Sequence, residues 1–410
     1  MPWNVSGKDL ARRRFVEEWL ASKNESFVAL CRRHGVARSC GYKWVERFRL
    51  NGRAGLEERS RRPQRAERCQ RQWQARLRLA SLQERDFGPK KLHWKLRRDY
   101  PRSRVPCVRT LARWLALWGR TRSRVRRPPA GPRVRVPGRL QGRCANDVWT
   151  IDFKGRFHTG DGHRVMALTV RDLASRYVLC VRHLAWADER CVREVMDRLF
   201  RRYGLPRAIR MDNGGPFGGG GPRGWTRLSV PWVKLGIRTE YGRPRHPEDN
   251  AQHEQMHREL KARTARPASC NLAAQQRRFE RWRQRYNHRR PHESLGQRTP
   301  AECYRPSLRM LPDEVAPWTY PAHWQILRPD TEGRCYWQRR QRLIGQAFAH
   351  ELLGVRALRA GVHAVYFRQH LIGTLHIDDR AGLRPVRRPQ PGAEREGLRP
   401  SQHPPLVLSD

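Results

Sequence analysis

The stretch DVWTIDFKGRF, residues 147–157, determines the fold class expected for this chain. Its residues predict a β-strand in which Thr150 and Asp152 point to one face and Trp149 and Ile151 to the other. An ionised carboxylate in the middle of a strand is costly unless it is paired or binds a metal ion. Asp152 is therefore the first candidate for a functional residue.

Outward from this strand, the sequence alternates between strand and helix patterns. The turn TGDG (159–162) leads into strands at 163–173 and 176–184, and a helix over about 187–204 ends at Gly204. A short strand (207–211), a helix near 226–235 and a strand (236–242) follow. This order predicts a mixed α/β domain. A long helix that Pro291 stops comes next, and short strands are expected from about 310, including LPDEV (311–315).

Two further acidic residues lie at positions where a site could form. Asp212 follows the strand AIRM (208–211) at its carboxyl end, where α/β sheets usually bind ligands. In HPEDNAQHEQMHRELK (246–261) a loop becomes a helix with Asn250 as the expected N-cap. The spacing i, i+3, i+4 and i+7 predicts one shared helix face, formed by Glu254, His257, Arg258 and Lys261. Taken alone, this face indicates a solvated helix with internal ion pairs. The alternative is a metal-binding carboxylate beside phosphate-binding groups.

Asp152, Asp212 and Glu254 together can form a cluster of three carboxylates. Such hard oxygen ligands suit Mg²⁺, or Mn²⁺ as a substitute, rather than Zn²⁺. Two such ions about 3.5–4 Å apart can activate a hydroxyl nucleophile and stabilise the leaving oxygen of a phosphodiester. This chemistry needs acidic ligands in basic surroundings, and the chain has both.

The composition points to a polyanionic partner. The 410 residues include 86 Lys and Arg against 38 Asp and Glu, which gives a net charge of +48. A surplus of this size favours nucleic acid as the partner. We expect no membrane association, because the sequence has neither a long apolar run nor a signal peptide. The ten cysteines form no C-x2-C pair, which predicts neither a zinc site nor a disulfide framework and suits a reducing cytoplasm.

Helical patterns precede the α/β segment. Residues 27–44 contain a helix, a turn at Gly35 and a second helix that starts near Ser39, as in a helix-turn-helix, although an ordinary helical hairpin has the same pattern. The expected DNA contacts lie on this second helix and on the basic connector after it, and they are Arg38, Ser39, Tyr42, Lys43, Arg61 and Arg62. A second helical block follows, either a smaller DNA-binding unit or a structural bundle. The segment after it, rich in Pro and Arg, reads as a basic linker.

Five segments together resemble the bacterial insertion-sequence transposases that have a retroviral-integrase-type core. They are DVWTIDFKGRF, RDLASRYVL, RYGLPRAIRMDNGGPF, LGIRTEYGRPRHPEDNAQHEQMHRELK and RWRQRYNHRRPHESLGQRTPAECYRPS. The N-terminal GVARSCGYKWVERF and LEERSRRP are similar to the helix-turn-helix of these proteins. The resemblance covers about residues 10–375.

The resemblance implies an RNase H-like mixed sheet flanked by helices, preceded by all-α helix-turn-helix domains and followed by a small β domain. It implies a catalytic triad of Asp152, Asp212 and Glu254, with Lys261 as a phosphate contact. His257 and Arg258 are expected to orient the helix or the DNA and are counted among the DNA-binding residues. The expected activity is Mg²⁺-dependent cleavage and strand transfer of double-stranded DNA at transposon ends, by a homo-multimer in the bacterial cytoplasm, associated with the nucleoid. The alternative is a DNA-binding regulator of the same descent without catalysis.

Six successive regions are expected along the chain. They are a helix-turn-helix domain (8–65), a second helical domain (66–119), a basic linker (120–143), the integrase-type core (144–308), a small β domain (309–377) and a disordered tail (378–410).

Overall fold

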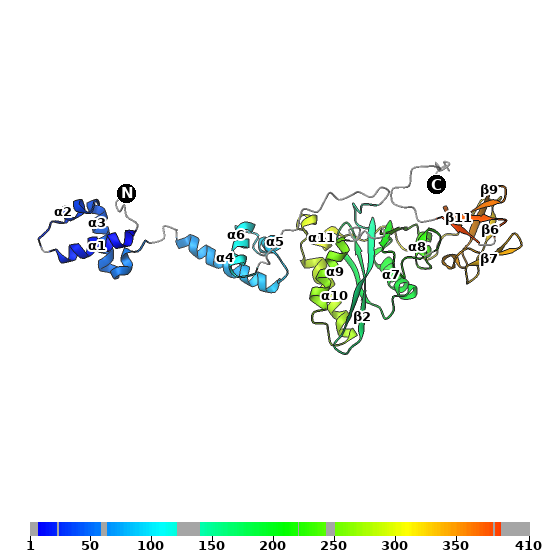
Figure 1. The fold of residues 1–410 in the computed structure, drawn as a ribbon, viewed down its shortest axis with the longest axis horizontal. Helices are drawn as coiled ribbons and strands as arrows, with labels where there is room; N and C mark the ends of the chain where they lie inside the picture. The colour runs from blue at the N-terminus through cyan, green and yellow to red at the C-terminus, as the bar shows by residue number, and fades with distance from the viewer. Residues whose placement is uncertain are drawn as a thin grey trace.

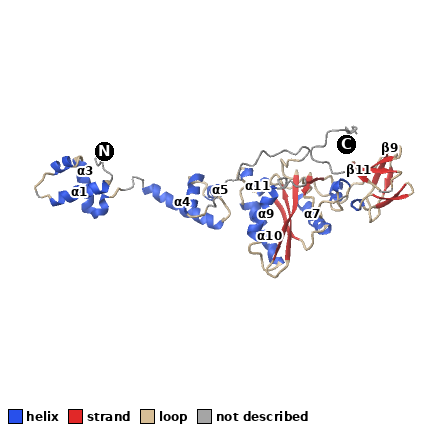
Figure 2. Cartoon of the chain, viewed as in Figure 1, coloured by secondary structure: helices blue, strands red, loops and turns tan. Residues whose placement is uncertain are grey.

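A computed structural model describes residues 7–22, 24–58, 64–120, 140–219, 221–242, 251–379 and 382–386. The helical N-terminal units, the mixed α/β core and the C-terminal β unit follow one another along the long axis of the molecule (Figure 1). Up to residue 147 the regular elements of the described residues are helices, and the strands begin at Val148 (Figure 2). Within the described residues, no helix is both long and apolar enough to cross a membrane.

The first unit is a three-helix arrangement. It comprises α1 (Lys8–Ala21), α2 (Phe27–Arg33) and α3 (Arg38–Asn51), followed by the 3₁₀ turn η1 (Gly52–Leu56). Ser26 caps α2 by accepting a hydrogen bond from the backbone N–H of Ala29. Phe15, Leu30 and Trp44 form its buried centre. The turn between α2 and α3 and the crossing of these helices match the expected helix-turn-helix.

The second unit has its own small core. Its helices are α4 (Gln64–Gln83), α5 (Pro89–Asp99) and α6 (Val108–Leu117). The buried residues include Trp73, Leu77, Leu92 and Trp114, which come from all three helices. A loop at residues 84–88 joins α4 to α5 and turns toward the α/β core.

The core is built on a five-stranded sheet in the order β3-β2-β1-β4-β5. Its strands are β1 (Val148–His158), β2 (Arg164–Asp172), β3 (Val178–His183), β4 (Ala208–Met211) and β5 (Arg238–Tyr241). β1, β2 and β3 pair antiparallel, whereas β4 and β5 extend the sheet in parallel from β1. This is an RNase H-like mixed sheet, and the expected fold class is confirmed.

Helices cover both faces of this sheet (Figure 1). On one face, α7 (Glu189–Tyr203) and α8 (Ser229–Lys234) pack over Trp149 and Ile151. On the other face, α9 (Ala251–Thr264) and α10 (Leu272–Arg289) pack over Val165. The alternation along β1 therefore separates an apolar core from the face on which Thr150 and Asp152 lie. The short elements η2 (Pro222–Gly224), η4 (Glu293–Leu295) and α11 (Pro300–Cys303) complete this unit.

The C-terminal unit is a small antiparallel β structure. A sheet in the order β12-β11-β10-β9-β6 stands beside the hairpin β7-β8. The strands are β6 (Gln325–Leu327), β7 (Arg334–Trp337), β8 (Arg340–Leu343), β9 (Leu353–Arg359), β10 (Val362–Phe367), β11 (His370–His376) and β12 (Arg384–Pro385), with the turn η5 (Gln346–Phe348) between β8 and β9. Its apolar core includes Trp225 and Val233. This β unit is therefore packed against the α8 region of the α/β core.

Four expectations from the sequence need correction or fall outside the described residues. LPDEV (311–315) is not a strand but an irregular, mostly exposed segment. The disordered tail was expected from residue 378, but Arg384 and Pro385 pair with β11. The N-cap Asn250, most of the linker (121–139) and the tail after 386 lie outside the described residues. The domain limits stay predictions.

Candidate active site

Strand pairing brings Asp152 and Asp212 together. In the parallel register of β1 and β4, Thr150 lies beside Arg210. Asp152 and Asp212 each lie two residues after this last pair, and the charge of Asp212 acts on Asp152. Asp212 follows the last residue of β4, and its Oδ1 accepts a hydrogen bond from the backbone N–H of Gly214 at 3.3 Å. The two carboxylates therefore stand at the same edge of the sheet.

Electrostatics join Glu254 to this pair. Glu254 lies in the first turn of α9, the helix that covers this face of the sheet. Burial, followed by the charge of Asp212 and with a smaller contribution from Glu254, raises the pKa of Asp152 to about 7. Burial likewise raises the pKa of Asp212. The anionic form of Asp152 is thus destabilised by burial and by the neighbouring carboxylates, and that of Asp212 by burial, which is the condition that a bound divalent cation relieves. An all-oxygen donor set of this kind fits Mg²⁺.

Cationic groups border the carboxylates. Lys154 follows Asp152 by two residues on β1, so both side chains point to the same face. Burial, followed by the charge of Lys261, lowers the pKa of Lys154, whereas the charges of Asp152 and Glu254 act in the opposite direction. Lys261 and Arg258 are exposed on α9. A phosphate approaching the carboxylates would therefore meet Lys154 and Lys261.

Two buried histidines connect α9 to the sheet under Asp152. The hydroxyl of Thr169 donates to the backbone carbonyl of Asp152 at 2.9 Å. The same oxygen lies 2.7 Å from Nε2 of His253 and 2.8 Å from Nε2 of His257. Because the single hydroxyl proton is already used, both histidine nitrogens must be the donors. The hydroxyl of Thr150 then donates to Nδ1 of His253 at 2.8 Å.

These contacts fix the protonation of the histidines. Burial lowers the pKa of His257 to about 3, and burial followed by the neighbouring His257 lowers the pKa of His253 well below its usual value. Both rings are therefore neutral. Nδ1 of His257 carries a lone pair and lies 3.8 Å from Oδ2 of Asp152. Asp152, His253 and His257 are close enough to hold a metal ion, but three of the four imidazole nitrogens are already bonded to threonines. The histidines thus fit a structural role.

The position of His257 corrects one expectation from the sequence. We predicted that it would share a face with Glu254 and contact DNA, yet its side chain is buried against the sheet. α9 turns His253, Met256 and His257 inward, and leaves Glu254, Arg258 and Lys261 outward. An i, i+4 pair of histidines in a helix predicts a shared face, and this signal was available at His253 and His257.

The start of α9 is fastened to β2 by a buried arginine. Arg171 is almost completely buried, and its Nη1 donates to the backbone carbonyl of Gln252 at 2.7 Å. Its Nη2 donates to the side-chain oxygen of Gln252 at 3.3 Å, and Arg176 bonds to that oxygen as well. This contact sets the first turn of α9, and with it Glu254, relative to the strand next to Asp152. Sequence reasoning missed Arg171, as it missed Lys154, His253 and Thr169.

The predicted DNA contacts of the helix-turn-helix lie on one exposed surface. Arg38, Ser39, Tyr42 and Lys43 are all exposed near the start of α3. The ring of Tyr42 stacks on Phe27 of α2 with centroids 4.1 Å apart and keeps 58% of its surface exposed. The surface is therefore formed at the start of the second helix, as a recognition helix requires. Arg61 and Arg62 lie outside the described residues.

Comparisons with known proteins match the two functional parts separately. Two models of the integrase core domain match residues 142–247 and 235–300, and a helix-turn-helix domain model matches residues 11–64. An insertion element IS476 uncharacterized 39.2 kDa protein of Xanthomonas euvesicatoria is 27% identical over 305 residues, which covers 73% of this chain and 83% of that protein.

Solved structures of integrases are also similar. The catalytic core domain of BIV integrase is 22% identical and covers 39% of this chain and 93% of that chain, with a TM-score of 0.29. The HTLV-2 integrase catalytic core domain, solved in complex with magnesium, is 13% identical and covers 40% of this chain and 99% of that chain, with a TM-score of 0.29.

Proposed function

Because the chain belongs to the transposase and integrase family, with an integrase core behind a helix-turn-helix domain, we propose that it is a DDE transposase. It binds the terminal repeats of an insertion sequence, cleaves the DNA there, and joins the freed 3′-hydroxyl to target DNA. The observation that supports this proposal is that Asp152 and Asp212 follow the same paired ends of β1 and β4, where the charges of Asp212 and Glu254 both act on Asp152.

Asp152, Asp212 and Glu254 would hold Mg²⁺, with Mn²⁺ as a possible substitute. When bound, two such ions would activate a hydroxyl nucleophile and stabilise the leaving oxygen. Asp152 must give up its proton to become a ligand, and its raised pKa makes that loss sensitive to pH near 7. The neutral His257 has its Nδ1 3.8 Å from Oδ2 of Asp152.

The other residues of the site bind and position. Lys154 and Lys261 are suited to bind the phosphates on either side of the scissile bond, since their charges are held beside the carboxylates. Thr169 orients the backbone of Asp152 and both histidines, and Arg171 orients the first turn of α9. Arg38, Ser39, Tyr42 and Lys43 are suited to read the terminal repeat in the major groove.

We also propose that the protein acts as a homo-multimer on paired ends in the bacterial cytoplasm, associated with the nucleoid. Pairing two transposon ends requires at least two sets of DNA-binding and catalytic residues. All ten cysteines are free, which fits a reducing compartment.

The proposal is tested by strand transfer with the full-length chain in Mg²⁺. The substrate is a duplex taken from inverted repeats in the DNA on either side of the gene. Asp152→Asn, Asp212→Asn and Glu254→Gln should each abolish joining and keep DNA binding, while Asp313→Asn, which removes the same charge from an exposed residue, should join normally. Joining by Asp152→Asn at the parental rate would refute the assignment. Tight binding without joining by the parental chain would favour a regulator instead.

A further inference from the structure

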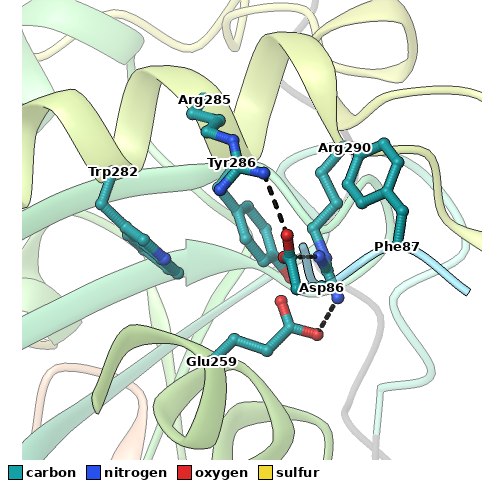
Figure 3. Close-up of a pocket in the computed structure, with 7 residues that line it drawn as sticks. All are labelled: Asp86, Phe87, Glu259, Trp282, Arg285, Tyr286 and Arg290. Carbon is teal, nitrogen blue, oxygen red and sulfur yellow. Dashed lines mark hydrogen bonds and ion pairs between the residues drawn. The ribbon is translucent and has the colours of Figure 1, made fainter. Parts of the chain in front are cut away.

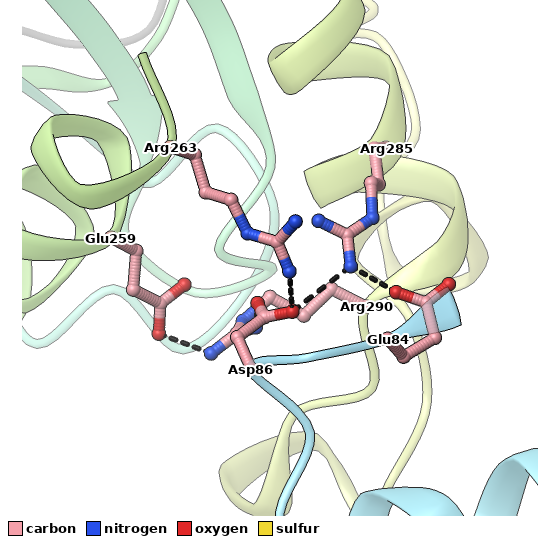
Figure 4. A network of polar contacts seen from close by, with 6 residues as sticks. All are labelled: Glu84, Asp86, Glu259, Arg263, Arg285 and Arg290. Atoms are coloured by element: carbon pink, nitrogen blue, oxygen red, sulfur yellow. Dashed lines mark hydrogen bonds and ion pairs between the residues drawn. The ribbon is translucent and has the colours of Figure 1, made fainter. Parts of the chain in front are cut away.

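The loop between α4 and α5 docks on the α/β core through an ion network. Glu84 and Asp86 reach from this loop to arginines of α9 and to arginines in and just after α10 (Figure 4). Asp86 stands at the centre. Its Oδ2 lies 2.5 Å from Nη1 of Arg290 and its Oδ1 lies 3.0 Å from Nη2 of Arg285. Arg263 of α9 also pairs with Asp86.

The network brings opposite charges together and is partly withdrawn from water, with Asp86 itself 30% exposed. Three carboxylates, those of Glu84, Asp86 and Glu259, face three guanidinium groups, those of Arg263, Arg285 and Arg290. The side chains of Arg290 and Glu84 are only 9% and 10% exposed. Removing one member of such a network leaves its partners buried without a counter-charge, which costs far more than losing a surface pair.

Apolar packing fixes the same loop. Phe87 is buried, and the guanidinium groups of Arg285 and Arg290 each lie 5.9 Å from its ring centroid. Phe87, Trp282 and Tyr286 help to line a cavity of about 10 Å³ among the charged groups (Figure 3). This volume holds about one water molecule. The arrangement is an interface between two units of the chain and has no room for a larger ligand.

Helix α5 continues the contact away from the loop. Lys90 pairs with Glu293 of η4 at 2.5 Å, and Arg98 approaches Glu302 of α11 at 3.4 Å. These pairs are exposed and contribute little to stability. In both pairs, a basic residue of α5 contacts an acidic residue of the core.

Helix α9 depends on such anchoring. It is 14 residues long, and isolated helices of this length are marginal in water. Met256 and Leu260 are its buried apolar side chains in the core. Arg171 fastens its first turn through Gln252. Glu259 and Arg263, five and nine residues after Glu254, tie its second half to the network.

We propose that Asp86 is a positioning residue for the reaction. By pairing with Arg263, Arg285 and Arg290, it fixes the second helical unit on the core and holds α9 in the place that brings Glu254 to Asp152 and Asp212. Helix α9 then couples two things: the position of the second helical unit and the geometry of the catalytic carboxylates. This inference rests on the proposed transposase function for its effect on catalysis, but its structural part can be tested without activity.

The test compares Asp86→Asn with a matched control in the full-length chain. Asp99→Asn removes the same charge from the end of α5, where Asp99 pairs with Lys95 of the same helix. The first readout is hydrogen exchange of peptides covering residues 251–264, without DNA or metal. Asp86→Asn should speed their exchange about tenfold or more, because the local opening of α9 becomes easier. Asp99→Asn should leave the exchange unchanged.

The second readout is strand transfer in Mg²⁺ at saturating DNA. Asp86→Asn should lower kcat and leave the apparent DNA affinity unchanged, and Asp86→Glu, which keeps the charge, should recover most of the rate. Parental exchange of residues 251–264 in Asp86→Asn would overturn the proposal, whatever the activity. Equal losses of kcat in Asp86→Asn and Asp86→Glu would also overturn it. Absence of joining by the parental chain would refute the transposase function and leave the exchange test valid.

Discussion

Replacing Asp152 with asparagine is expected to stabilise the metal-free core while it abolishes catalysis. In the folded chain, burial and the neighbouring carboxylates raise the pKa of Asp152 from 3.8 to about 7. The folded state therefore holds a proton that the unfolded chain releases near pH 4. As pH rises from 3.8 through 7, the folded state loses stability because the carboxylate must ionise in an unfavourable place. Asparagine resembles the protonated acid in shape and avoids this loss.

The size of the effect follows from the shift in pKa. A tenfold change in a proton dissociation constant corresponds to about 1.4 kcal/mol, so the shift of Asp152 corresponds to about 4 kcal/mol above pH 7. The side chain retains 18% of its exposure and interacts strongly with Asp212, so we expect about 2–4 kcal/mol. The difference between variant and parent should vanish below pH 4, where both side chains are neutral.

Hydrogen exchange of residues 148–158 in EDTA measures the stability difference between variant and parent at β1 itself. A local measurement is needed because a chain of several units does not unfold in one step. After correction for intrinsic exchange rates, opening of β1 in Asp152→Asn should be about 30-fold to 1000-fold rarer than in the parent at pH 8. Asp313→Asn is the control for loss of charge. Asp212→Asn should also stabilise β1, because it removes the charge that acts most strongly on Asp152.

Two results would refute this reasoning. If Asp152→Asn and Asp313→Asn changed the opening of β1 equally at pH 8, Asp152 would not be held among buried carboxylates. If the advantage of Asp152→Asn did not shrink between pH 8 and pH 4, ionisation would not be its cause. Saturating Mg²⁺ should stabilise the parent and reduce its difference from the variant, because the metal binds the folded carboxylates.

Three further predictions concern the same face of the core. Binding of Mg²⁺ should release up to one proton from Asp152. The affinity for Mg²⁺ should therefore rise by as much as about tenfold per pH unit below pH 7 and level off above it. Calorimetry in buffers of different ionisation enthalpy should detect the released proton, and heats that do not depend on the buffer would contradict it. Thr169→Val leaves two buried imidazole N–H donors without an acceptor and should lower the free energy of opening of β1 and β2, measured by hydrogen exchange, by about 2–5 kcal/mol, whereas Thr169→Ser should retain most of the stability. Lys261→Ala should lower the salt dependence of DNA binding by about one phosphate contact; an equal change in Arg277→Ala, on the exposed side of α10, would assign the effect to net charge alone.

Local patterns in the sequence predicted much of the fold, because they report short-range physics. The alternation in VWTIDF indicated a strand with Asp152 on one face, and β1 has this form. Gly204 was expected to end the helix before it, and α7 ends at Tyr203 with Gly204 as its C-cap at a positive φ of 73°. LPDEV misled because an alternating pattern of five residues does not form a strand where no partner strand lies beside it.

The sequence by itself determined which acidic residues were candidates, and it identified the helix-turn-helix and the basic surroundings. Only the tertiary structure decided which side of α9 faces the sheet, and so moved His257 from the expected DNA surface to a buried contact with Asp152. It also revealed that Lys154, Thr169 and Arg171 lie around Asp152 and the start of α9. It further revealed the contact of Asp86 with Arg263, Arg285 and Arg290, across about 200 residues of chain. The physical reason is that periodicity depends on neighbours in sequence, whereas burial, pKa and ion pairing depend on strand register and helix docking between distant segments.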